Sequence, residues 1–289
     1  MKGFIYINGA LVPRAEARIS PLDRGILYGY GLFETMRSYG GHVFSLDRHL
    51  ARLMHSAGII GLNAGLDPDT IGQAIYKTLE ANECPDARIR LTILAGEGER
   101  GLTLPTSGTL TIIIVAERLV LPPPQAYKEG LCAVVASTRR NSRSLLSGIK
   151  SINYLDNLFA QSEAVTAGAD QAILLNELGF VAECSTSNIF MVVGGQLLTP
   201  SVESGILPGV TREKVIELAL NLGVAVVEEE ISLAVLLRAD EAFMTNSVIE
   251  VMPVTAVDGK PVGSGMVGEI TEKLMRAYRE MVLQQGNHC

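Results

Sequence analysis

The order of apolar and polar residues along the chain predicts a mixed α/β protein. Apolar residues that recur every three or four positions are typical of amphipathic helices, whereas short apolar or alternating runs between turn-forming residues indicate strands. Ser45 precedes one helical pattern as a plausible N-cap, and Gly223 follows another as a plausible C-terminal cap. The predicted helices cover 46–58, 69–82, 151–167, 211–222 and 269–283, and the predicted strands cover 4–8, 88–95, 109–116, 131–137, 171–175, 180–183, 189–193, 196–198, 224–228 and 241–245.

A run of three prolines at 122–124 predicts where the chain divides. Proline cannot continue a helix interior or a central strand, and a proline-rich stretch is stiff and extended. We therefore expect a linker over 121–128, between a small N-terminal α/β domain (1–120) and a larger C-terminal α/β domain (129–289). A chain of 289 residues, of which 47% are hydrophobic, can bury a core in each of two such domains.

Composition and charge argue against several classes of function. The formal net charge of −7 argues against nucleic acid, because binding to the phosphate backbone needs a basic surface. The densest apolar run, 110–116, is too short to span a membrane, and the first residues lack a secretory pattern. Four scattered cysteines without a CxxC pair, and four histidines without ligand spacing, predict reduced thiols in a cytoplasmic protein and no metal site.

Among the lysines, Lys150 has the sequence surroundings that best suit a reactive amine. The chain has seven lysines, and most of the others lie at a terminus, in a turn or on a polar helix face. Lys150 instead lies in SGIKSINY (147–154), at the predicted entry to a helix, between small and apolar neighbours. Partial desolvation there would lower the pKa of the amine and free it to form a Schiff base. Tyr154 follows four residues later, near the same face if the first turn is helical. Spacing alone nevertheless favours a structural lysine.

Three further segments carry groups that could bind an anionic ligand with a basic ring. Glu183 ends an apolar strand, and an inward carboxylate there needs a cationic partner, such as a protonated pyridine nitrogen. The segment GILPGVTR (205–212) opens a helix, whose N–H groups and dipole favour a phosphate. The turn at 245–247 could add hydroxyl donors. In isolation, a solvent-facing glutamate, a capped helix and a polar turn explain these segments about as well.

The segment GEGERG (96–101) matches GxGxxG but does not predict a dinucleotide site. Such a site needs a helix that opens at the glycines, and here LTLP and another strand follow. We interpret the segment as a hairpin loop. Arg100 in this loop could bind a substrate carboxylate or be a solvated loop arginine, and the pattern favours neither.

Six segments, taken together, identify a family. They are YGYGLFETMR (28–37), LDRHLARL (46–53), IKSINYLDNLFAQSEA (149–164), VAECSTSNIF (181–190), TPSVESGILPGVTR (199–212) and FMTNSVIEVMPV (243–254). In this order they resemble the fold-type IV family of pyridoxal 5′-phosphate (PLP) enzymes, which includes branched-chain and D-amino acid aminotransferases, R-selective amine transaminases and aminodeoxychorismate lyases. The resemblance spans nearly the whole chain. It implies a two-domain α/β fold with PLP in the cleft, and a homodimer.

The resemblance also implies a role for individual residues. Lys150 matches the Schiff-base lysine, and Glu183 matches the acid that keeps the pyridine nitrogen protonated. Tyr154 matches the residue that hydrogen-bonds the ring hydroxyl. The residues that match phosphate ligands are Arg48, Val210, Thr211 and Ser247.

The reaction that the resemblance implies has two alternatives. The first is transamination of a small amino acid, of branched-chain or D-amino acid type, with a 2-keto acid as acceptor. The second is the aminodeoxychorismate lyase reaction, which forms 4-aminobenzoate and pyruvate. FETMR resembles the lyases and would place Phe33 and Thr35 near the substrate. Arg100 matches a carboxylate-binding arginine of D-amino acid aminotransferases, although Leu102 stands where those enzymes have histidine. A PLP-free binding protein on the same fold is a third alternative.

Overall fold

The chain folds into two compact units, each with its own hydrophobic core. The computed structural model describes residues 3–99, 101–104 and 109–286. One unit comprises Met1–Val120, Ile149–Asn153 and Gln285–Cys289, and the other comprises Leu121–Gly148 and Tyr154–Gln284. The chain first passes from one unit to the other between Val120 and Leu121. Residues 149–153, which the sequence placed in the C-terminal domain, instead belong to the first unit.

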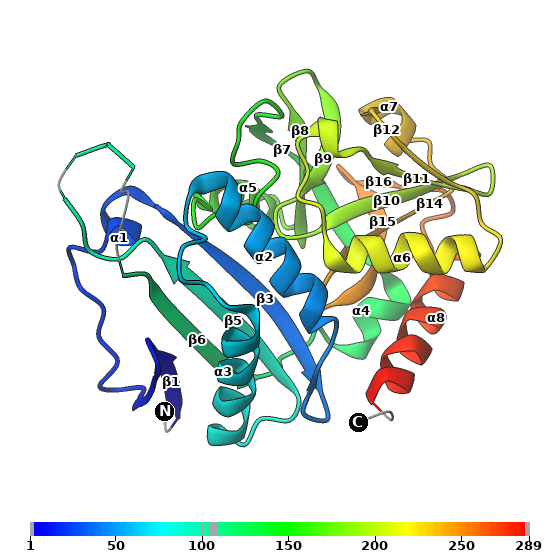
Figure 1. The fold of residues 1–289 in the computed structure, drawn as a ribbon. Helices are drawn as coiled ribbons and strands as arrows, with labels where there is room; N and C mark the ends of the chain where they lie inside the picture. The colour runs from blue at the N-terminus through cyan, green and yellow to red at the C-terminus, as the bar shows by residue number, and fades with distance from the viewer. Residues whose placement is uncertain (1–2, 100, 105–108, 287–289) are drawn as a thin grey trace. The chain divides into compact units, whose positions relative to one another are not determined.

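The first unit is built on a six-stranded sheet in which neighbouring strands are antiparallel. Its order is β2-β1-β6-β5-β3-β4, and two helices, α2 and α3, pack against it (Figure 1). Both helices are amphipathic and bury apolar residues. Asp67 caps α3, because its carboxylate accepts the Thr70 N–H at 2.9 Å. The elements are β1 (Phe4–Ile7), β2 (Ala10–Pro13), α1 (Arg24–Tyr28), β3 (Gly31–Tyr39), β4 (His42–Val43), α2 (Leu46–Ile60), α3 (Pro68–Ala81), β5 (Ala87–Leu94) and β6 (Thr111–Arg118).

Residues 149–153 run beside the first half of β3. Leu32 and Ser151 form an isolated antiparallel bridge. The Phe33 N–H donates to the Lys150 carbonyl at 2.9 Å. These backbone bonds fix the position of Lys150 relative to β3 rather than to a helix.

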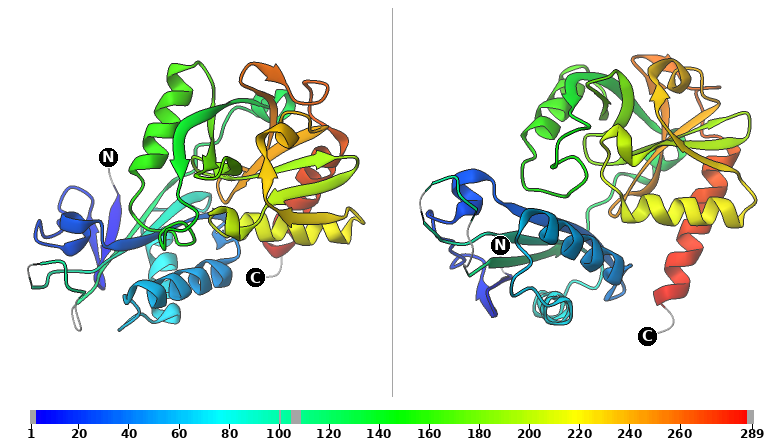
Figure 2. Two further views of the ribbon diagram at one scale, coloured as in Figure 1. Left: turned by 90° about the horizontal axis from the view of Figure 1, so that it is seen from above. Right: turned by 45° about the horizontal axis from the view of Figure 1, so that its top comes forward.

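The second unit is built on a ten-stranded sheet of order β12-β11-β10-β14-β15-β7-β8-β9-β13, with β16 paired to β15. Parallel pairs join β7 to β8, β7 to β15 and β11 to β12. Helix α5 packs on β7 and β8, whereas α6 packs on β12 and β14 (Figure 2). The elements are α4 (Pro124–Glu129), β7 (Leu131–Arg140), α5 (Leu155–Thr166), β8 (Gln171–Asn176), β9 (Phe180–Cys184), β10 (Asn188–Val193), β11 (Gln196–Pro200), η1 (Val202–Ser204), α6 (Val210–Asn221), β12 (Val226–Glu229), β13 (Ile231–Ser232), α7 (Leu233–Leu236), β14 (Glu241–Asn246), β15 (Glu250–Val257), β16 (Lys260–Pro261) and α8 (Glu269–Gly286).

Most predicted helices are confirmed, with ends that differ by up to three residues: they are α2, α3, α6 and α8. The predicted start of the helix 151–167 is wrong, because residues 149–153 pair with β3 and α5 begins only at Leu155. The short helix α4 overlaps the expected linker and ends one residue beyond it. Ser45 precedes α2 with a left-handed backbone, φ 50°, and its side chain makes no capping hydrogen bond. No helix in the described part of the chain is long and apolar enough to cross a membrane.

The apolar side of α5 faces outward within its unit. Leu155, Leu158 and Phe159 are 63%, 65% and 59% exposed. The residues that α5 buries are Asn157, Ala160 and Ala164. The small alanines let the helix approach β7 and β8 closely, and the large side chains remain uncovered.

Candidate active site

Lys150 lies in the first unit, with its amine next to an aromatic ring. Its Nζ is 4.5 Å from the centroid of the Phe33 ring, and the residue is partly buried. The guanidinium carbon of Arg90 is 3.8 Å from the same centroid. Two cations therefore contact one ring, whose faces attract positive charge. Phe33 lies on β3 and Arg90 on β5, so two hydrogen-bonded strands position both. The sequence analysis did not single out Arg90.

A buried carboxylate follows Phe33 directly. Glu34 is 1% exposed, and its Oε2 lies 2.8 Å from His49 Nδ1. Arg52 donates from Nε to Oε1 at 2.9 Å and from Nη2 to Oε2 at 2.6 Å. We call Glu34, His49 and Arg52 the Glu34 cluster. Both helical members come from α2, where positions three apart share a side.

Charge and burial fix the protonation states in the Glu34 cluster. Burial opposes ionisation of Glu34, but the Arg52 charge and the hydrogen bonds from His49 and Arg52 outweigh it and hold the pKa of the carboxyl at about 2. Burial lowers the pKa of His49, and the positive charges of Arg52 and Lys150 lower it further, against the effect of Glu34. Glu34 is therefore an anion, and a neutral His49 donates to it from Nδ1.

Two other predicted residues also lie in the first unit. Arg48 is partly buried on α2, and Arg52 follows it by one turn. Thr35 is two residues after Phe33 on β3, so both side chains are on one face of the sheet. In the strand register Thr35 lies opposite Arg90.

The loop after β5 is a hairpin connection, as predicted. Strands β5 and β6 pair antiparallel over their whole length, so no helix opens at the glycines. Arg24, which is buried, donates to the carbonyls of Glu99 (2.5 Å), Gly101 (3.3 Å) and Thr103 (2.7 Å) in this loop. Arg100 lies outside the described residues, so its role stays a prediction.

Glu183 lies in the second unit, near the end of β9, and is 5% exposed. Its Oε1 is 3.1 Å from Nη2 of Arg140, and its Oε2 accepts the Leu207 N–H at 2.9 Å. Burial and the neighbouring Glu183 charge raise the pKa of the Cys184 thiol. The 5% exposure excludes a glutamate that faces water, which the sequence had left as an alternative.

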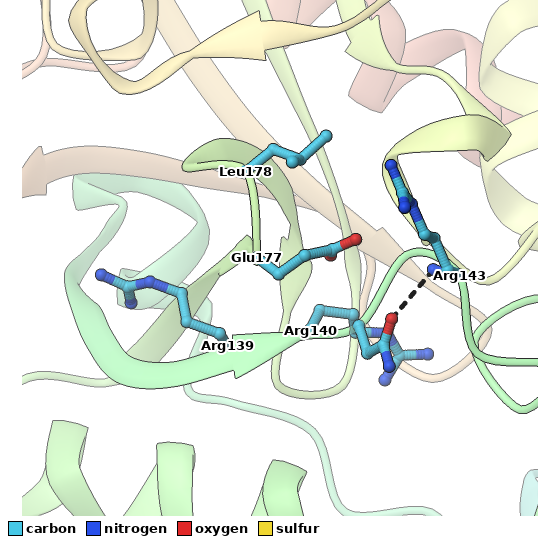
Figure 3. Close-up of a pocket in the computed structure, with 6 residues that line it drawn as sticks. Arg139, Arg140, Arg143, Glu177 and Leu178 are labelled. Carbon is cyan, nitrogen blue, oxygen red and sulfur yellow. Dashed lines mark hydrogen bonds between the residues drawn. The ribbon is translucent and has the colours of Figure 1, made fainter.

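Arg140 also lines a cavity of about 440 Å³ at the surface of this unit. Figure 3 shows that the side chains of Arg139 and Arg143 diverge from each other around Glu177. Arg139 Nη1 donates to backbone carbonyls, and the Glu177 carboxylate accepts the Ser142 N–H at 2.8 Å. These charges thus hold the loop after β7.

The N-terminus of α6 has the features of an anion-binding site. Its N-cap is Gly209, where a Cβ atom would lie 2.0 Å from Asn188 Oδ1. Asn188 in turn donates to the Leu207 carbonyl at 2.8 Å. Gly209 has no side chain that could cap the helix. The first-turn N–H groups, from Val210 onward, are the donors that bind phosphate at helix starts. Thr211 adds a hydroxyl at a position that is 3% exposed.

The remaining predicted residues lie at the end of β14 and the start of α5. Ser247 follows Asn246, whose Nδ2 donates to Ser187 Oγ at 2.9 Å. Thr245 Oγ1 is buried and has no hydrogen-bond partner among the described residues. Tyr154 is the N-cap of α5. The predicted helical spacing between Lys150 and Tyr154 does not exist, because residues 149–153 are not helical.

Each unit thus supplies different chemistry. The first supplies a primary amine beside an aromatic ring and an arginine. The second supplies a buried carboxylate and a helix start that favours anions. Within residues 3–99, 101–104 and 109–286, no group of three histidine, cysteine, aspartate or glutamate side chains could hold a metal ion.

Known proteins resemble the chain along almost its whole length. Residues 31–257 match the family described as amino-transferase class IV. A putative branched-chain-amino-acid aminotransferase of Methanocaldococcus jannaschii is 39% identical over 283 residues, which cover 98% of this chain and 97% of that protein. An aminodeoxychorismate lyase of Bacillus subtilis is 37% identical over 280 residues, 96% of this chain and 94% of the lyase. The crystal structure of a T.th. branched-chain amino acid aminotransferase with pyridoxamine 5′-phosphate matches with a TM-score of 0.92 and 31% identity, covering 98% of this chain and 94% of that chain.

Proposed function

Because the chain belongs to the class IV aminotransferase family, we propose that it transfers the amino group of a small apolar amino acid, of branched-chain type, to a 2-keto acid. Membership of the family makes the chain a PLP-dependent aminotransferase of fold-type IV. What we propose is the identity of its substrate. The observation that carries the proposal is that the amine of Lys150 and the guanidinium of Arg90 both contact the Phe33 ring. An apolar ring beside a cation suits an apolar side chain and a carboxylate. A D-amino acid is supported less well, because Leu102 stands where D-amino acid aminotransferases have a histidine, and its side chain has no donor for a carboxylate.

The residues present fit PLP. This cofactor has an aldehyde, a basic ring nitrogen and a phosphate, so it needs an amine, a carboxylate and an anion site. We assign the amine to Lys150, the carboxylate to Glu183, and the phosphate to the first turn of α6 with Val210 and Thr211. The buried hydroxyl of Thr245 supports the fit, because a polar ligand can satisfy a hydroxyl that has no partner among the described residues.

Three more ligands complete the proposal. Tyr154 binds the ring hydroxyl, Ser247 adds a phosphate contact, and an arginine of α2 neutralises phosphate charge. The resemblance assigns that arginine to Arg48. Arg52 is a second candidate, since Glu34 holds its guanidinium rigidly. PLP affinities of Arg48→Ala and Arg52→Ala decide between them.

The reaction then follows from the side chains. PLP supplies the electron sink that makes removal of the substrate Cα proton tolerable. Lys150 accepts and returns that proton as general base and acid. Glu183 keeps the ring nitrogen protonated, and Arg140 and the Leu207 N–H orient its carboxylate. Arg90 binds the substrate carboxylate.

A spectrum of the purified protein tests the proposal. We expect a visible band with PLP that branched-chain amino acids convert to the shorter-wavelength pyridoxamine form without any acceptor. Lys150→Ala should abolish both, whereas Lys150→Arg, the matched control, should keep the fold and still lack the band. A protein that binds no PLP, or a band that no amino acid changes, would contradict this function.

Aminodeoxychorismate lyase activity is the second candidate function. It is supported by Thr35 on the same strand face as Phe33, and by the similarity to the Bacillus subtilis lyase. A lyase releases pyruvate and an aromatic amine without a keto acid. Pyruvate formed from aminodeoxychorismate, with a band unchanged by amino acids, would replace the first proposal by this one.

We further propose that the protein is a cytoplasmic homodimer. The exposed side of α5, formed by Leu155, Leu158, Phe159 and Val165, needs an apolar cover, and a second copy would supply it. Cys84 and Cys132 carry free thiols, which fit a reducing compartment. Analytical ultracentrifugation tests the dimer, and a molecular mass equal to that of one chain would contradict it.

A further inference from the structure

The turn between β14 and β15 ends on a glutamate at a position where hairpins of this kind favour glycine. Asn246 pairs with Glu250 in the strand register, so residues 247–249 form the connection. The backbone of Glu250 is left-handed, with φ 62°, a conformation that glycine adopts freely and a larger residue adopts at a cost. Glu250 is also 8% exposed, so a carboxylate is buried at the same point. Two unfavourable features at one residue call for a role.

This turn carries Ser247, which we assign to the phosphate. The side chain of Asn246 organises the turn from its start, because its Oδ1 accepts the N–H groups of Val248 and Ile249, both at 2.9 Å. The Asn246 Nδ2 donates to Ser187 Oγ at 2.9 Å and ties the turn to the residue before β10. The position of the Ser247 hydroxyl thus depends on how firmly both ends of the turn are held.

Two helices hold the other end of the turn. Tyr127, on α4, donates its hydroxyl to the Ile249 carbonyl at 3.3 Å. Arg279, on α8, has its Nε 3.7 Å from Glu250 Oε2, and its guanidinium carbon is 5.4 Å from the centroid of the Tyr127 ring. Arg279 therefore contacts both of the other side chains, as an ion pair with one and over the ring of the other. We call Tyr127, Glu250 and Arg279 the turn brace.

The turn brace gives a reason for a glutamate at the left-handed position. Glycine would relieve the backbone but would leave Arg279 without the Glu250 carboxylate. Helix α4 lies before β7 and α8 closes the second unit, so the brace ties the turn to segments from both ends of that unit's sequence. Contacts to two packed helices oppose movement of the turn as a whole, which the hydrogen bonds inside it do not.

We propose that Tyr127, Glu250 and Arg279 are positioning residues that fix the turn 246–250, so that the Ser247 hydroxyl stays in place for the phosphate. The proposal rests on the proposed function in taking Ser247 as a phosphate contact. None of the three residues needs to contact the phosphate for the brace to act, because its effect on the cofactor passes through the turn.

Hydrogen–deuterium exchange of the full chain freed of PLP tests the first step, that the brace holds the turn. Arg279→Met removes the ion pair at a side chain that is 55% exposed, so the fold should survive. The N–H groups of Val248 and Ile249 should then exchange about two- to fivefold faster, as expected for the loss of one partly exposed ion pair. Tyr127→Phe, which removes only a hydroxyl, should change the exchange in the same direction. Arg279→Lys keeps the charge and should restore most of the protection.

The affinity for PLP tests the second step, that the brace acts through Ser247. Arg279→Met should raise the dissociation constant of PLP about two- to fivefold, as measured by absorption. The same change in a Ser247→Ala background should have no further effect, because the hydroxyl that the brace positions is already gone. General damage to the second unit would instead weaken binding equally in both backgrounds.

Lys273→Met is the matched control for the loss of a positive charge on α8. Lys273 Nζ is 2.6 Å from Glu269 Oε1, an ion pair on the same helix that involves no residue of the turn brace. Its loss should change neither the exchange of the turn nor the affinity for PLP.

Two outcomes overturn the proposal. The first is exchange of the turn N–H groups that is the same in the two brace variants and in the wild type. The second is a loss of PLP affinity that Ser247→Ala does not abolish, or no loss at all, because the brace would then not act through Ser247. A protein that binds no PLP in any form contradicts the proposed function instead, and the exchange measurement still decides whether the brace holds the turn.

Discussion

Glu34 in the first unit and Glu183 in the second are both buried against an arginine, and the two pairs differ in the way the arginine binds the carboxylate. Glu34 receives two hydrogen bonds from Arg52 and one from His49, so side chains bind both of its oxygens. Glu183 receives Arg140 on one oxygen at 3.1 Å and a backbone N–H on the other. The bidentate Arg52 fork is the stronger arrangement.

The difference extends to the arginines. Arg140 shares its guanidinium among Glu183 and the carbonyls of Gly205 and Ser147. Arg140 thus shares its N–H groups among three acceptors, whereas Arg52 gives two of its N–H groups to Glu34. The comparison distinguishes a carboxylate bound by an arginine fork from the carboxylate that we assign to the ring nitrogen of PLP.

The largest effect expected from this comparison is on catalysis at Glu183. Glu183→Gln keeps the shape but removes the charge that we assign to the protonated ring nitrogen. The kcat should fall by about 10²–10³-fold, as when other electrostatic contacts of a transition state are lost. Steady-state rates, with PLP loading checked by absorption, measure this effect.

An equal loss of activity at the two glutamates would remove the distinction between the pairs. If Glu183→Gln and Glu34→Gln lower kcat equally at equal PLP loading, Glu183 has no special role. We expect a smaller kcat effect from Glu34→Gln, because Glu34 acts only through its neighbours.

The residue pattern singled out Lys150 and Glu183, and the family resemblance gave them their roles, but neither led to the Glu34 cluster. Lys150 stood out because its neighbours are small and apolar, and Glu183 because it ends an apolar strand. Glu34 carries the same kind of signal, since it alternates with Leu32 and Met36 and so falls on a core face. Strand β3 was not predicted, and without it that alternation had no meaning.

The fold was predictable where the pattern is local. Helices α2, α3, α6 and α8 follow from their own periodicity and end signals. The position of residues 149–153 beside β3 does not, because it depends on a pairing with a strand far earlier in the chain. The exposed side of α5 has the same cause, since an apolar stripe does not reveal which partner covers it.

The next effect concerns stability in acid and isolates Glu34. Its pKa is about 2 in the folded protein and near 4.5 when unfolded, so its contribution is complete above pH 4.5 and is lost as the pH falls toward 2. The unfolding free energy of the wild type should lose about 3 kcal/mol more than that of Glu34→Gln over this range. Urea melts of both proteins at each pH measure the difference. Parallel pH profiles would mean that Arg52 and His49 do not stabilise the ionised carboxylate.

The smallest effect comes from the same exchange made in both pairs. Arg52→Lys replaces the two-pronged contact to Glu34 by a single ammonium and should cost about 1–2 kcal/mol of unfolding free energy, while Arg140→Lys should cost about half as much. The reason is geometric: lysine cannot reproduce the fork, and only Glu34 receives one. Arg140→Lys should instead weaken PLP binding, because Glu183 loses part of its orientation. Urea melts of the PLP-free variants measure the loss of stability, and PLP titrations measure the loss of cofactor affinity. An equal loss of stability in Arg52→Lys and Arg140→Lys would mean that the two-bond contact to Glu34 contributes nothing extra.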